Sequence, residues 1–371
     1  MKTVLTVLGT RPEIVKFSPL LPLLDRRFRH VLAHTGQHYD DNMDRVFFRE
    51  LHLKLPQHFL NVGSGSQGAQ TARMLERLEP IMLKTRPDLV LVLGDTNSTL
   101  AGALVAAKLN IPIGHVEAGC RSFNRAMPEE KNRILVDHAS TWLFAPDLQA
   151  VRHLRNEGIR AAQIYRVGNT GLDATLRTMK LARADRLCKF GVRPDSYALA
   201  TLHRAENTNE LERFARLIEA INHVGHRVPV LFPIHPRTVS IMNRHRIRLK
   251  NGVRALSPLG HLDFIALLRN SVFVMSDSGG IQEEAAVVNR PCLILREETE
   301  WRRHVESGKN FLVGTQKDAI VRTGSRILSS RELQRKIAQK RAPLQFGAAK
   351  KILRFLQKKG FACLSWESQS S

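Results

Sequence analysis

The stretch LVLVLGDTNSTL, residues 89–100, decides the fold class, because an unbroken apolar run leads directly into a polar turn and a helix start. Five consecutive apolar residues indicate a strand that is buried on both faces, as in a parallel sheet. Thr96, Asn97 and Ser98 are candidate N-caps for an alanine-rich helix that we expect over 99–109. Ligands of open α/β sheets bind outside the carboxyl ends of the strands, so Asp95 is a candidate site residue. An acid at a helix start also stabilises the helix dipole, which is a competing structural explanation.

Two further acids follow in the same segment. The apolar run 111–116 predicts the next strand, and Glu117 comes directly after it, before a glycine turn. We interpret His115, inside that run, as a buried core histidine whose ring nitrogens are hydrogen-bonded. Pro128 suits the first position of a helix, which places Glu129 and Glu130 in its opening turn. Acids there favour the dipole, so a structural role competes with a catalytic one for both.

The chain also begins with a predicted strand that is followed by a turn and a helix. Residues 3–8 predict a strand, and the turn that follows can present backbone N–H groups to an anion. Arg11 and Lys16 add positive charge beside this turn. An ordinary turn with solvated basic side chains explains the pattern equally well.

The length of 371 residues predicts two domains, because one core rarely serves so long a chain. The turn cluster at 167–171 closes the first, and strand–helix alternation then restarts. We therefore expect an α/β protein with two Rossmann-like, doubly wound parallel-sheet domains, over residues 1–171 and 172–345, followed by a C-terminal segment over 346–371.

The second half carries histidine, arginine and a glycine pair at predicted strand ends. His203 and Arg204 follow the run 198–202, and His235 follows the run 228–232. Ser278, Gly279 and Gly280 come after the run 272–275 and form the best phosphate-binding loop in the chain. Glu284, one turn into the next helix, is placed to reach ribose hydroxyls, or to stabilise the helix dipole. The chain has neither GxxxxGK[ST] nor GxGxxG, so ATP and NAD have no positive support.

Composition narrows the functional classes. The chain has 57 Lys and Arg against 34 Asp and Glu, a formal net charge of +23, yet aromatic residues are only 6%. Because the charge is spread along the chain, we interpret it as a solvated basic surface and expect no nucleic-acid partner. The four cysteines are scattered, which suggests free thiols and no zinc site. No apolar run approaches the ~20 residues of a membrane span, so we expect a soluble, cytoplasmic protein.

Motifs in order along the chain resemble those of the non-hydrolysing UDP-N-acetylglucosamine 2-epimerase family. They are GTRPE at 9–13, TGQH at 35–38, GDT at 94–96, HVEAG at 115–119, MPEE at 127–130 with Asn132 and Arg133, GNT at 168–170, LHR at 202–204, IHP at 234–236 and SDSGGIQEE at 276–284. The resemblance runs from residue 3 to about residue 315.

This resemblance implies a glycosyltransferase-B-like fold with the active site in the interdomain cleft and the last helix returning to the first domain. It implies conversion of UDP-GlcNAc to UDP-ManNAc by elimination and re-addition of UDP through a 2-acetamidoglucal, without metal or nicotinamide cofactor, in a homodimer. It assigns catalysis to Asp95, Glu117, Glu129, Lys16 and His203, and UDP binding to Arg11, Ser278, Gly279, Gly280, Glu284 and Arg204. A possible effector site for a second UDP-GlcNAc comprises Gln37, His38, Arg73 and His235. Which carboxylate is the base stays open.

The chain departs from the motifs of the family at several positions, and these differences leave other functions open. Trp301, Arg302 and Arg303 stand where many relatives have Arg-Pro-Glu, which resembles epimerases of substituted sugars such as 2,3-diacetamido uronic acids. The pair Pro12-Glu13 instead resembles the GlcNAc enzymes. Asp40 replaces a glutamine of the effector site, and the Gly-Asp-Gly pattern before the last helix is reduced to Phe346-Gly347. A hydrolysing 2-epimerase that releases ManNAc and UDP, and a basic nucleic-acid-binding or scaffold protein on a degenerate enzyme fold, are the competing functions.

Overall fold

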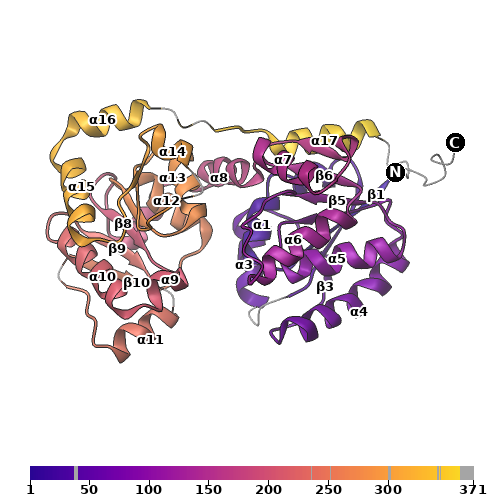
Figure 1. Cartoon of the computed structure of the whole chain (residues 1–371), viewed down its shortest axis with the longest axis horizontal. Coiled ribbons are helices and arrows are strands. Elements are labelled where there is room, and N and C mark those ends of the chain that lie inside the picture. The colour runs from indigo at the N-terminus through magenta and orange to yellow at the C-terminus, as the bar shows by residue number, and fades with distance from the viewer. Residues whose placement is uncertain are drawn as a thin grey trace. The chain divides into compact units, whose positions relative to one another are not determined.

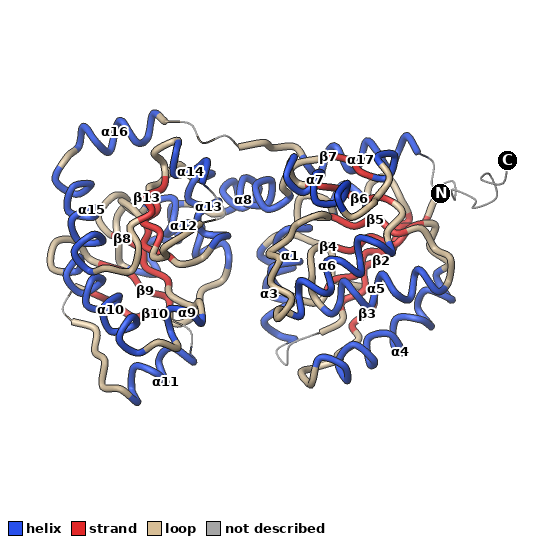
Figure 2. The backbone as a smooth tube through the Cα atoms, in the orientation of Figure 1, coloured by secondary structure: helices blue, strands red, loops and turns tan. Residues whose placement is uncertain are grey.

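The computed structural model describes residues 1–36, 41–234, 236–250, 252–299, 302–340, 342 and 344–359 (Figure 2). The chain divides into two compact units. Unit 1 is Met1–Ala174 with the segment that starts at Gln345, and unit 2 is Thr175–Leu344. Within the described ranges, every helix is too short or too polar to cross a membrane.

Unit 1 is built on a seven-stranded sheet in the order β3-β2-β1-β4-β5-β6-β7, and every pair in it is parallel. The strands are β1 (Thr3–Leu8), β2 (Arg29–His34), β3 (His58–Phe59), β4 (Leu89–Leu93), β5 (Ile113–Val116), β6 (Trp142–Ala145) and β7 (Ile164–Arg166). All residues of β1, β4, β5 and β6 are buried, as expected for central parallel strands with helices on both faces.

The helices of unit 1 connect and cover these strands (Figure 1). They are α1 (Arg11–Phe17), α2 (Leu21–Asp25), α3 (Asp41–Glu50), α4 (Gln67–Thr85), α5 (Asn97–Lys108), α6 (Pro128–Ala139), α7 (Leu148–Asn156), a short 3-10 helix η1 (Ala161–Gln163) and α8 (Thr170–Leu181), within which unit 1 ends. The predicted N-cap of α5 is confirmed: the Thr96 hydroxyl accepts from Thr99 N. Pro128 opens α6, also as predicted.

Unit 2 repeats the same winding on six parallel strands, in the order β10-β9-β8-β11-β12-β13. Its strands are β8 (Ala198–Thr201), β9 (Val230–Pro233), β10 (Val253–Leu256), β11 (Val274–Ser276), β12 (Cys292–Ile294) and β13 (Asn310–Leu312). Its helices are η2 (Ala184–Phe190), α9 (Ala205–Thr208), α10 (Leu211–Gly225), α11 (Pro236–Arg244), α12 (His261–Asn270), α13 (Gly279–Val287), α14 (Arg302–Glu306), α15 (Lys317–Ser329) and α16 (Arg331–Gln339). The fold class predicted from the sequence, two doubly wound parallel-sheet domains, is therefore confirmed.

The last described helix, α17 (Ala348–Lys359), belongs to unit 1. Phe355 of α17 packs against Trp142, Phe144 and Tyr165 of strands β6 and β7, with ring centroids 4.2–5.6 Å apart. The Asp173 carboxylate accepts from Gly347 N at 2.6 Å and Ala349 N at 2.9 Å, which satisfies donors that a helix start leaves unpaired. Aromatic packing and this cap attach α17 to unit 1.

Both sheets reverse their winding at one point. In unit 1 the chain moves outward from β1 to β2 and β3, then returns to β4 on the other side of β1. In unit 2 the corresponding strands are β8 and β11. Ligands of doubly wound sheets bind at such a switch point, outside the carboxyl ends of the strands. The loops after β1, β4, β8 and β11 are therefore the places to search for a site.

Candidate active site

Asp95 and Glu117 lie at the carboxyl ends of adjacent strands in unit 1. Leu93, the last residue of β4, is in register with Val116, the last residue of β5. Asp95 follows the first by two residues and Glu117 follows the second by one. The predicted placement of both acids past the ends of buried parallel strands is confirmed.

Glu117 is paired with Lys16 of α1. The Lys16 ammonium donates to Glu117 Oε2 at 2.7 Å, and the two side chains are 38% and 13% exposed. Thr170 Oγ1 lies 3.4 Å from the other carboxylate oxygen. Glu117 has φ +66°, a left-handed conformation that costs a non-glycine residue about 1–3 kcal/mol. Such strain persists only where the surroundings fix it, and it is concentrated at functional sites.

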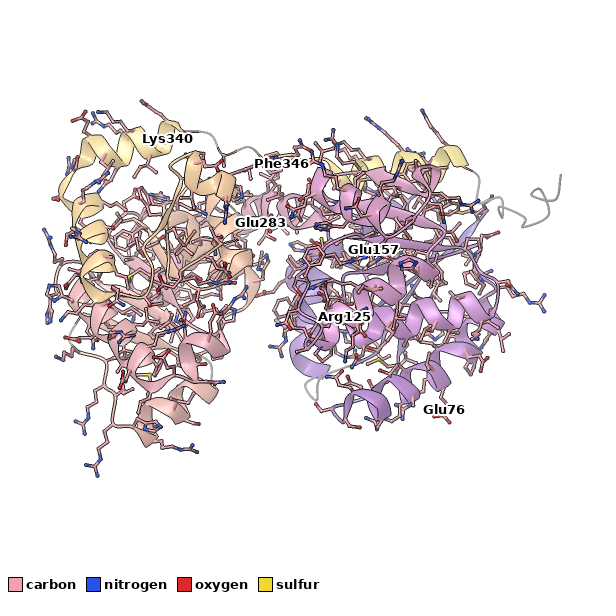
Figure 3. The ribbon with its side chains drawn as sticks, viewed as in Figure 1. Glu76, Arg125, Glu157, Glu283, Lys340 and Phe346 are labelled. Carbon is pink, nitrogen blue, oxygen red and sulfur yellow. The ribbon has the colours of Figure 1, made fainter. Side chains whose placement is uncertain are left out.

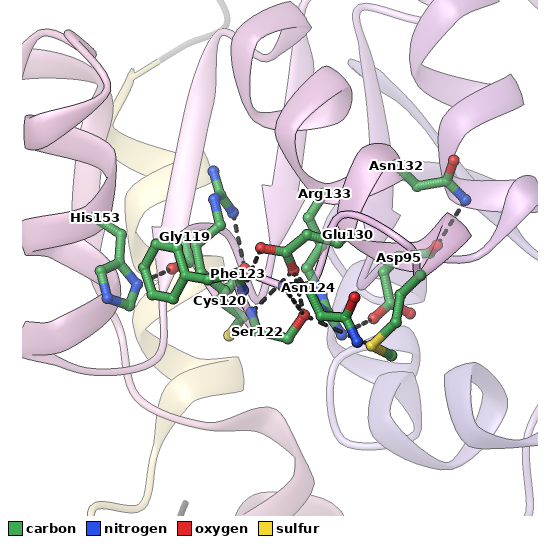
Figure 4. A network of polar contacts seen from close by, with 12 residues as sticks. Asp95, Gly119, Cys120, Ser122, Phe123, Asn124, Glu130, Asn132, Arg133 and His153 are labelled. Atoms are coloured by element: carbon green, nitrogen blue, oxygen red, sulfur yellow. Dashed lines mark hydrogen bonds and ion pairs between the residues drawn. The ribbon is translucent and has the colours of Figure 1, made fainter.

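Asp95 is paired with Arg133 of α6, which links it to Glu130 (Figure 4). Arg133 donates to Asp95 Oδ2 at 2.5 Å and to Glu130 Oε2 at 2.8 Å. The buried Glu130 carboxylate also accepts from the backbone N–H groups of Ser122 and Phe123, at 2.9 Å each. Burial raises the pKa of Glu130, but these hydrogen bonds and Arg133 outweigh it and lower the pKa to about 2. Glu130 is therefore charged at neutral pH and holds both the 122–124 loop and Arg133.

Glu129, the third predicted catalytic acid, is placed differently. It is exposed in the first turn of α6, and within the described part of the chain its carboxylate has no hydrogen-bond or ion-pair partner. Asn132, on the same helix, donates to Asp95 O at 2.9 Å. The structure thus ties Glu130, Asn132 and Arg133 to the Asp95 turn, and leaves Glu129 available to a ligand.

A fourth acid, Glu13, is buried beneath these turns at 2% exposure. It accepts from Gly9 N at 3.0 Å, Thr10 Oγ1 at 2.8 Å and Thr96 Oγ1 at 2.9 Å, which joins the turn after β1 to the turn after β4. Burial raises its pKa, against the effect of these hydrogen bonds. Gly9 has no room for a side chain, since a Cβ atom there would lie 2.0 Å from Thr35 Oγ1. Glu13 therefore holds together the two turns that form the switch point of unit 1.

Arg11, the predicted phosphate ligand of unit 1, is held by α3. Its Nε donates to Asp44 Oδ1 at 3.3 Å, and its guanidinium carbon lies 5.7 Å from the centre of the Phe47 ring. The Arg11 side chain is one-third exposed, whereas Asp44 is buried. Arg11 is therefore oriented by α3 and retains an accessible surface for an anion.

In unit 2, the buried Asp277 organises the loops after β8 and β11. Its carboxylate accepts from His203 N at 3.2 Å, Arg204 N at 3.1 Å and Asn207 Nδ2 at 3.1 Å, and His203 Nδ1 lies 3.2 Å from Oδ1. Burial raises the pKa of Asp277, but the contacts with His203, Arg204 and Asn207 outweigh it and lower the pKa. The His203 side chain remains 53% exposed. The His203 ring is thus oriented by a buried carboxylate and keeps an exposed surface for a ligand.

The predicted phosphate loop begins α13. Ser278 is its N-cap, Gly279 and Gly280 are its first residues, and Ser278 N donates to Ser276 Oγ at 3.0 Å. A Cβ atom at Gly280 would meet nothing closer than Ser278 Oγ at 3.9 Å, so this helix start is open. Glu284 lies within α13 and is half-buried. His203, Arg204, Ser278, Gly279 and Gly280 thus come from the loops after β8 and β11, at the switch point of unit 2.

The predicted effector residues are only partly described. Gln37, His38 and His235 lie outside the described residues, as do Asp40 and Trp301. Arg73 of α4 is described, and it donates to Ser64 O at 3.1 Å. Three of the cysteines, Cys120, Cys188 and Cys292, are free thiols as predicted, and Cys363 lies outside the described residues.

Sequence patterns alone do not assign the buried acids Glu13, Asp44 and Asp277. Glu13 and Asp277 both lie within motifs of the family resemblance; Asp277 is flanked by Ser276 and Ser278, and Glu13 follows Gly9 and Thr10 by four and three residues. An acid surrounded by small donors after an apolar run is the signal that could have found them. Asp44 has no comparable signal, because its partner Arg11 is 33 positions away.

A family model described as UDP-N-acetylglucosamine 2-epimerase matches residues 23–357. The chain belongs to the UDP-N-acetylglucosamine 2-epimerase family. It is 46% identical over 334 residues to a UDP-N-acetylglucosamine 2-epimerase of Methanococcus maripaludis, covering 87% of this chain and 91% of the relative. It is 43% identical over 324 residues to a UDP-2,3-diacetamido-2,3-dideoxy-D-glucuronate 2-epimerase of Pseudomonas aeruginosa, covering 86% and 90%.

Solved structures extend this similarity to the whole fold. The UDP-GlcNAc 2-epimerase of Methanocaldococcus jannaschii in complex with UDP-GlcNAc and UDP matches with a TM-score of 0.82 and 41% identity, covering 96% of this chain and 99% of that chain. The protein is thus an enzyme of the epimerase family, and a role as a basic scaffold on a degenerate fold has no support from its relatives.

Proposed function

We propose that this epimerase interconverts UDP-N-acetylglucosamine and UDP-N-acetylmannosamine by inverting C2 of the sugar. One observation carries the proposal: two accessible carboxylates, each held by its own cation, lie at the carboxyl ends of the adjacent strands β4 and β5. Asp95 is 29% exposed beside Arg133, and Glu117 is 13% exposed beside Lys16. Epimerisation needs such a pair, because a proton must leave one face of C2 and another must arrive on the opposite face.

The mechanism divides the work between removing a proton and stabilising a leaving group. A carboxylate of the set Asp95, Glu117 and Glu129 removes the C2 proton while the C1–O bond to UDP breaks, which leaves a 2-acetamidoglucal. UDP then adds back to C1 as an acid protonates C2 on the other face. Clustered carboxylates can push their pKa values apart, so one can act as acid while its neighbour acts as base.

The departing UDP carries the negative charge of the reaction, and cations and N–H donors must stabilise it. We propose that His203, Arg204, Ser278, Gly279 and Gly280 of unit 2 bind the diphosphate, that Glu284 binds the ribose hydroxyls, and that Lys16 and Arg11 of unit 1 neutralise charge that develops on the leaving oxygen. The exposed His203 ring in front of the buried Asp277, and the open start of α13, support this assignment.

The choice of substrate is the second part of the proposal. The M. maripaludis and M. jannaschii relatives bear the UDP-GlcNAc name, and the P. aeruginosa relative acts on a diacetamido uronate at similar identity. The pair Pro12-Glu13 resembles the sequence of the GlcNAc enzymes at this position, and Glu13 joins the turns after β1 and β4. We therefore propose UDP-GlcNAc as the substrate, with Gln37, His38, Arg73 and His235 as a possible effector site in a homodimer.

Product identification tests the proposal. The purified enzyme is incubated separately with UDP-GlcNAc and with the UDP-diacetamido uronate, and products are separated by ion exchange and identified by NMR. UDP-ManNAc from the first substrate, at equilibrium with it, is the expected result. Free ManNAc with UDP indicates hydrolysis instead, and turnover of the uronate alone assigns the other substrate.

A further inference from the structure

Three of the four histidines in the strands of unit 1, His30, His34 and His115, have ring nitrogens that face different partners. His34 Nδ1 accepts from Gly36 N at 3.2 Å, so this nitrogen carries no hydrogen, and burial lowers the pKa of His34 to about 4. His30 Nδ1 lies 2.7 Å from Asp25 Oδ1, and its Nε2 lies 2.9 Å from the Thr6 hydroxyl, which can either donate or accept. Neither environment forces two hydrogens onto the ring.

His115 is different, because both of its ring nitrogens face groups that only accept. The residue is fully buried on β5. Its Nδ1 lies 2.6 Å from Asp137 Oδ1 and its Nε2 lies 2.8 Å from the carbonyl oxygen of Gly94. A backbone carbonyl cannot donate, and neither can an ionised carboxylate. Burial raises the pKa of Asp137, but the contacts with His115 and Arg121 outweigh it and lower the pKa, so Asp137 is the anion.

The same pair joins the two turns that carry the candidate acids. Gly94, whose carbonyl His115 contacts, directly precedes Asp95. The other oxygen of Asp137 accepts from Gly119 N at 3.0 Å, two residues after Glu117. Gly94, Glu117 and Gly119 all have positive φ angles, of 76°, 66° and 79°. Glycine adopts positive φ readily, so the strain is at Glu117, and such a conformation persists only if other contacts fix it. His115 with Asp137 supplies one contact to each turn.

Charges around the pair are balanced. Asp137 Oδ2 also contacts Arg121 at 2.7 Å, and Arg121 in turn contacts Glu157, labelled in Figure 3, at 2.6 Å. With a cationic His115, these four groups sum to zero charge, and Glu157, which is 26% exposed, also lies 3.6 Å from His138 Nε2.

We propose that His115 is a protonated positioning residue whose imidazolium, paired with Asp137, fixes the turns that hold Asp95 and Glu117 for acid–base chemistry at C2. The positioning role rests on the proposed function of those two acids. The protonation state rests on the hydrogen-bond geometry at both ring nitrogens together with the anionic state of Asp137.

Neutron diffraction from deuterated crystals grown near pH 8 tests the protonation state without any substitution. A solvated histidine is neutral at that pH, with a typical pKa of about 6.5. Deuterium on both ring nitrogens of His115 is the expected result. Density on only one nitrogen, or a deuteron on Asp137 in place of the one on His115 Nδ1, overturns the proposal.

Substitutions test the positioning role. His115→Gln and Asp137→Asn are compared with His30→Gln, which removes another buried histidine–aspartate contact of the same sheet, away from the candidate acids. We expect kcat to fall about 10- to 100-fold in the first two variants, the size of effect that ~1 Å misplacement produces, while KM changes little. The His30 variant should lose thermal stability with kcat retained.

The outcomes are separable. If His115→Gln folds and keeps the kcat of the His30 control, the positioning role is wrong. If Asp95→Asn and Glu117→Gln also keep wild-type kcat, the proposed function of the acids has failed instead. If neither the His115 nor the Asp137 variant folds, the neutron result decides: deuterium on both ring nitrogens supports the proposal, and density on one nitrogen overturns it.

Discussion

Replacing Glu13 by glutamine should leave the stability of unit 1 almost unchanged, whereas replacing it by alanine should reduce it strongly. Glu13 Oε2 accepts from Gly9 N and Thr10 Oγ1, and Oε1 faces the hydroxyls of Thr96 and Thr99 at 2.9 and 3.1 Å. The Thr99 hydroxyl also lies 2.7 Å from Leu93 O, and its single hydrogen serves only one of the two acceptors. A protonated Glu13 supplies the missing hydrogen, in agreement with its raised pKa.

The magnitudes follow from this arrangement. A glutamine can place its carbonyl where Oε2 lies and direct its amide hydrogens to the two threonine hydroxyls, so the free energy of unfolding should change by less than about 1 kcal/mol. Alanine leaves Gly9 N and the Thr10 hydroxyl without their acceptor in a buried site. At about 1–3 kcal/mol for each such group, the loss is about 2–6 kcal/mol.

Urea unfolding observed at one tryptophan measures this effect in unit 1. Trp142 of β6 is 4% exposed and reports on that unit once Trp301 and Trp366 are replaced by phenylalanine. Because Trp142 lies in unit 1, its fluorescence follows the unfolding of that unit alone, and the two units need not unfold in a single transition. The refuting results are a glutamine variant as unstable as the alanine variant, or equal stability of all three proteins.

A pH series gives the sign of the titration. A folded-state pKa above the value of 4.5 for the unfolded chain means that the folded protein binds the extra proton. Wild-type stability should therefore decline relative to Glu13→Gln as pH rises from about 4.5 through the raised pKa. A constant difference between the two proteins over this range contradicts a protonated Glu13.

Three further predictions concern the site itself. Asp95→Asn and Glu117→Gln should each lower kcat by ~10²-fold or more with thermal unfolding little changed, as is typical when a general acid or base is lost, and near-normal turnover removes that residue from the mechanism. Glu130→Gln should lower the free energy of unfolding by about 2 kcal/mol at neutral pH, because hydrogen bonds to a charged carboxylate are lost. Since the pKa of Glu130 is lowered to about 2, the difference measured by chemical unfolding should shrink as pH falls from about 4.5 toward 2. A difference that does not change with pH refutes this origin. His203→Ala should weaken UDP binding about tenfold by calorimetry, the effect of one lost charge-assisted hydrogen bond, and unchanged affinity rejects its contact with the diphosphate.

The sequence predicts the central strands of both sheets well, because long apolar runs bounded by turns have few alternative structures. Strands at 3–8, 89–93 and 198–202 are found within one residue of their expected ends. The strand expected from residue 111 starts at Ile113, after Pro112. The edge strands β3, β7, β10 and β13 are not predicted, since each is short and exposes polar or mixed residues.

The placement of two candidate acids is predicted, because it depends only on where buried strands end. Asp95 and Glu117 follow from their position after buried runs, because parallel strands bring their carboxyl ends together. Their partners do not follow, since Lys16 is 101 positions from Glu117 and Arg133 is 38 positions from Asp95. The choice between Glu129 and Glu130 depends on side-chain direction at a helix start, where one acid is exposed and its neighbour is buried against the 122–124 loop.

The most direct test of the account follows hydrogen at C2. The enzyme is incubated with UDP-GlcNAc in deuterated water, and the first UDP-ManNAc formed is analysed by NMR and mass spectrometry. Proton removal and return by unit 1 carboxylates predicts one solvent deuteron at C2 of the product. The Asp95→Asn and Glu117→Gln variants should form this deuterated product at least ~10²-fold more slowly. UDP-ManNAc that retains its original C2 hydrogen would contradict the account.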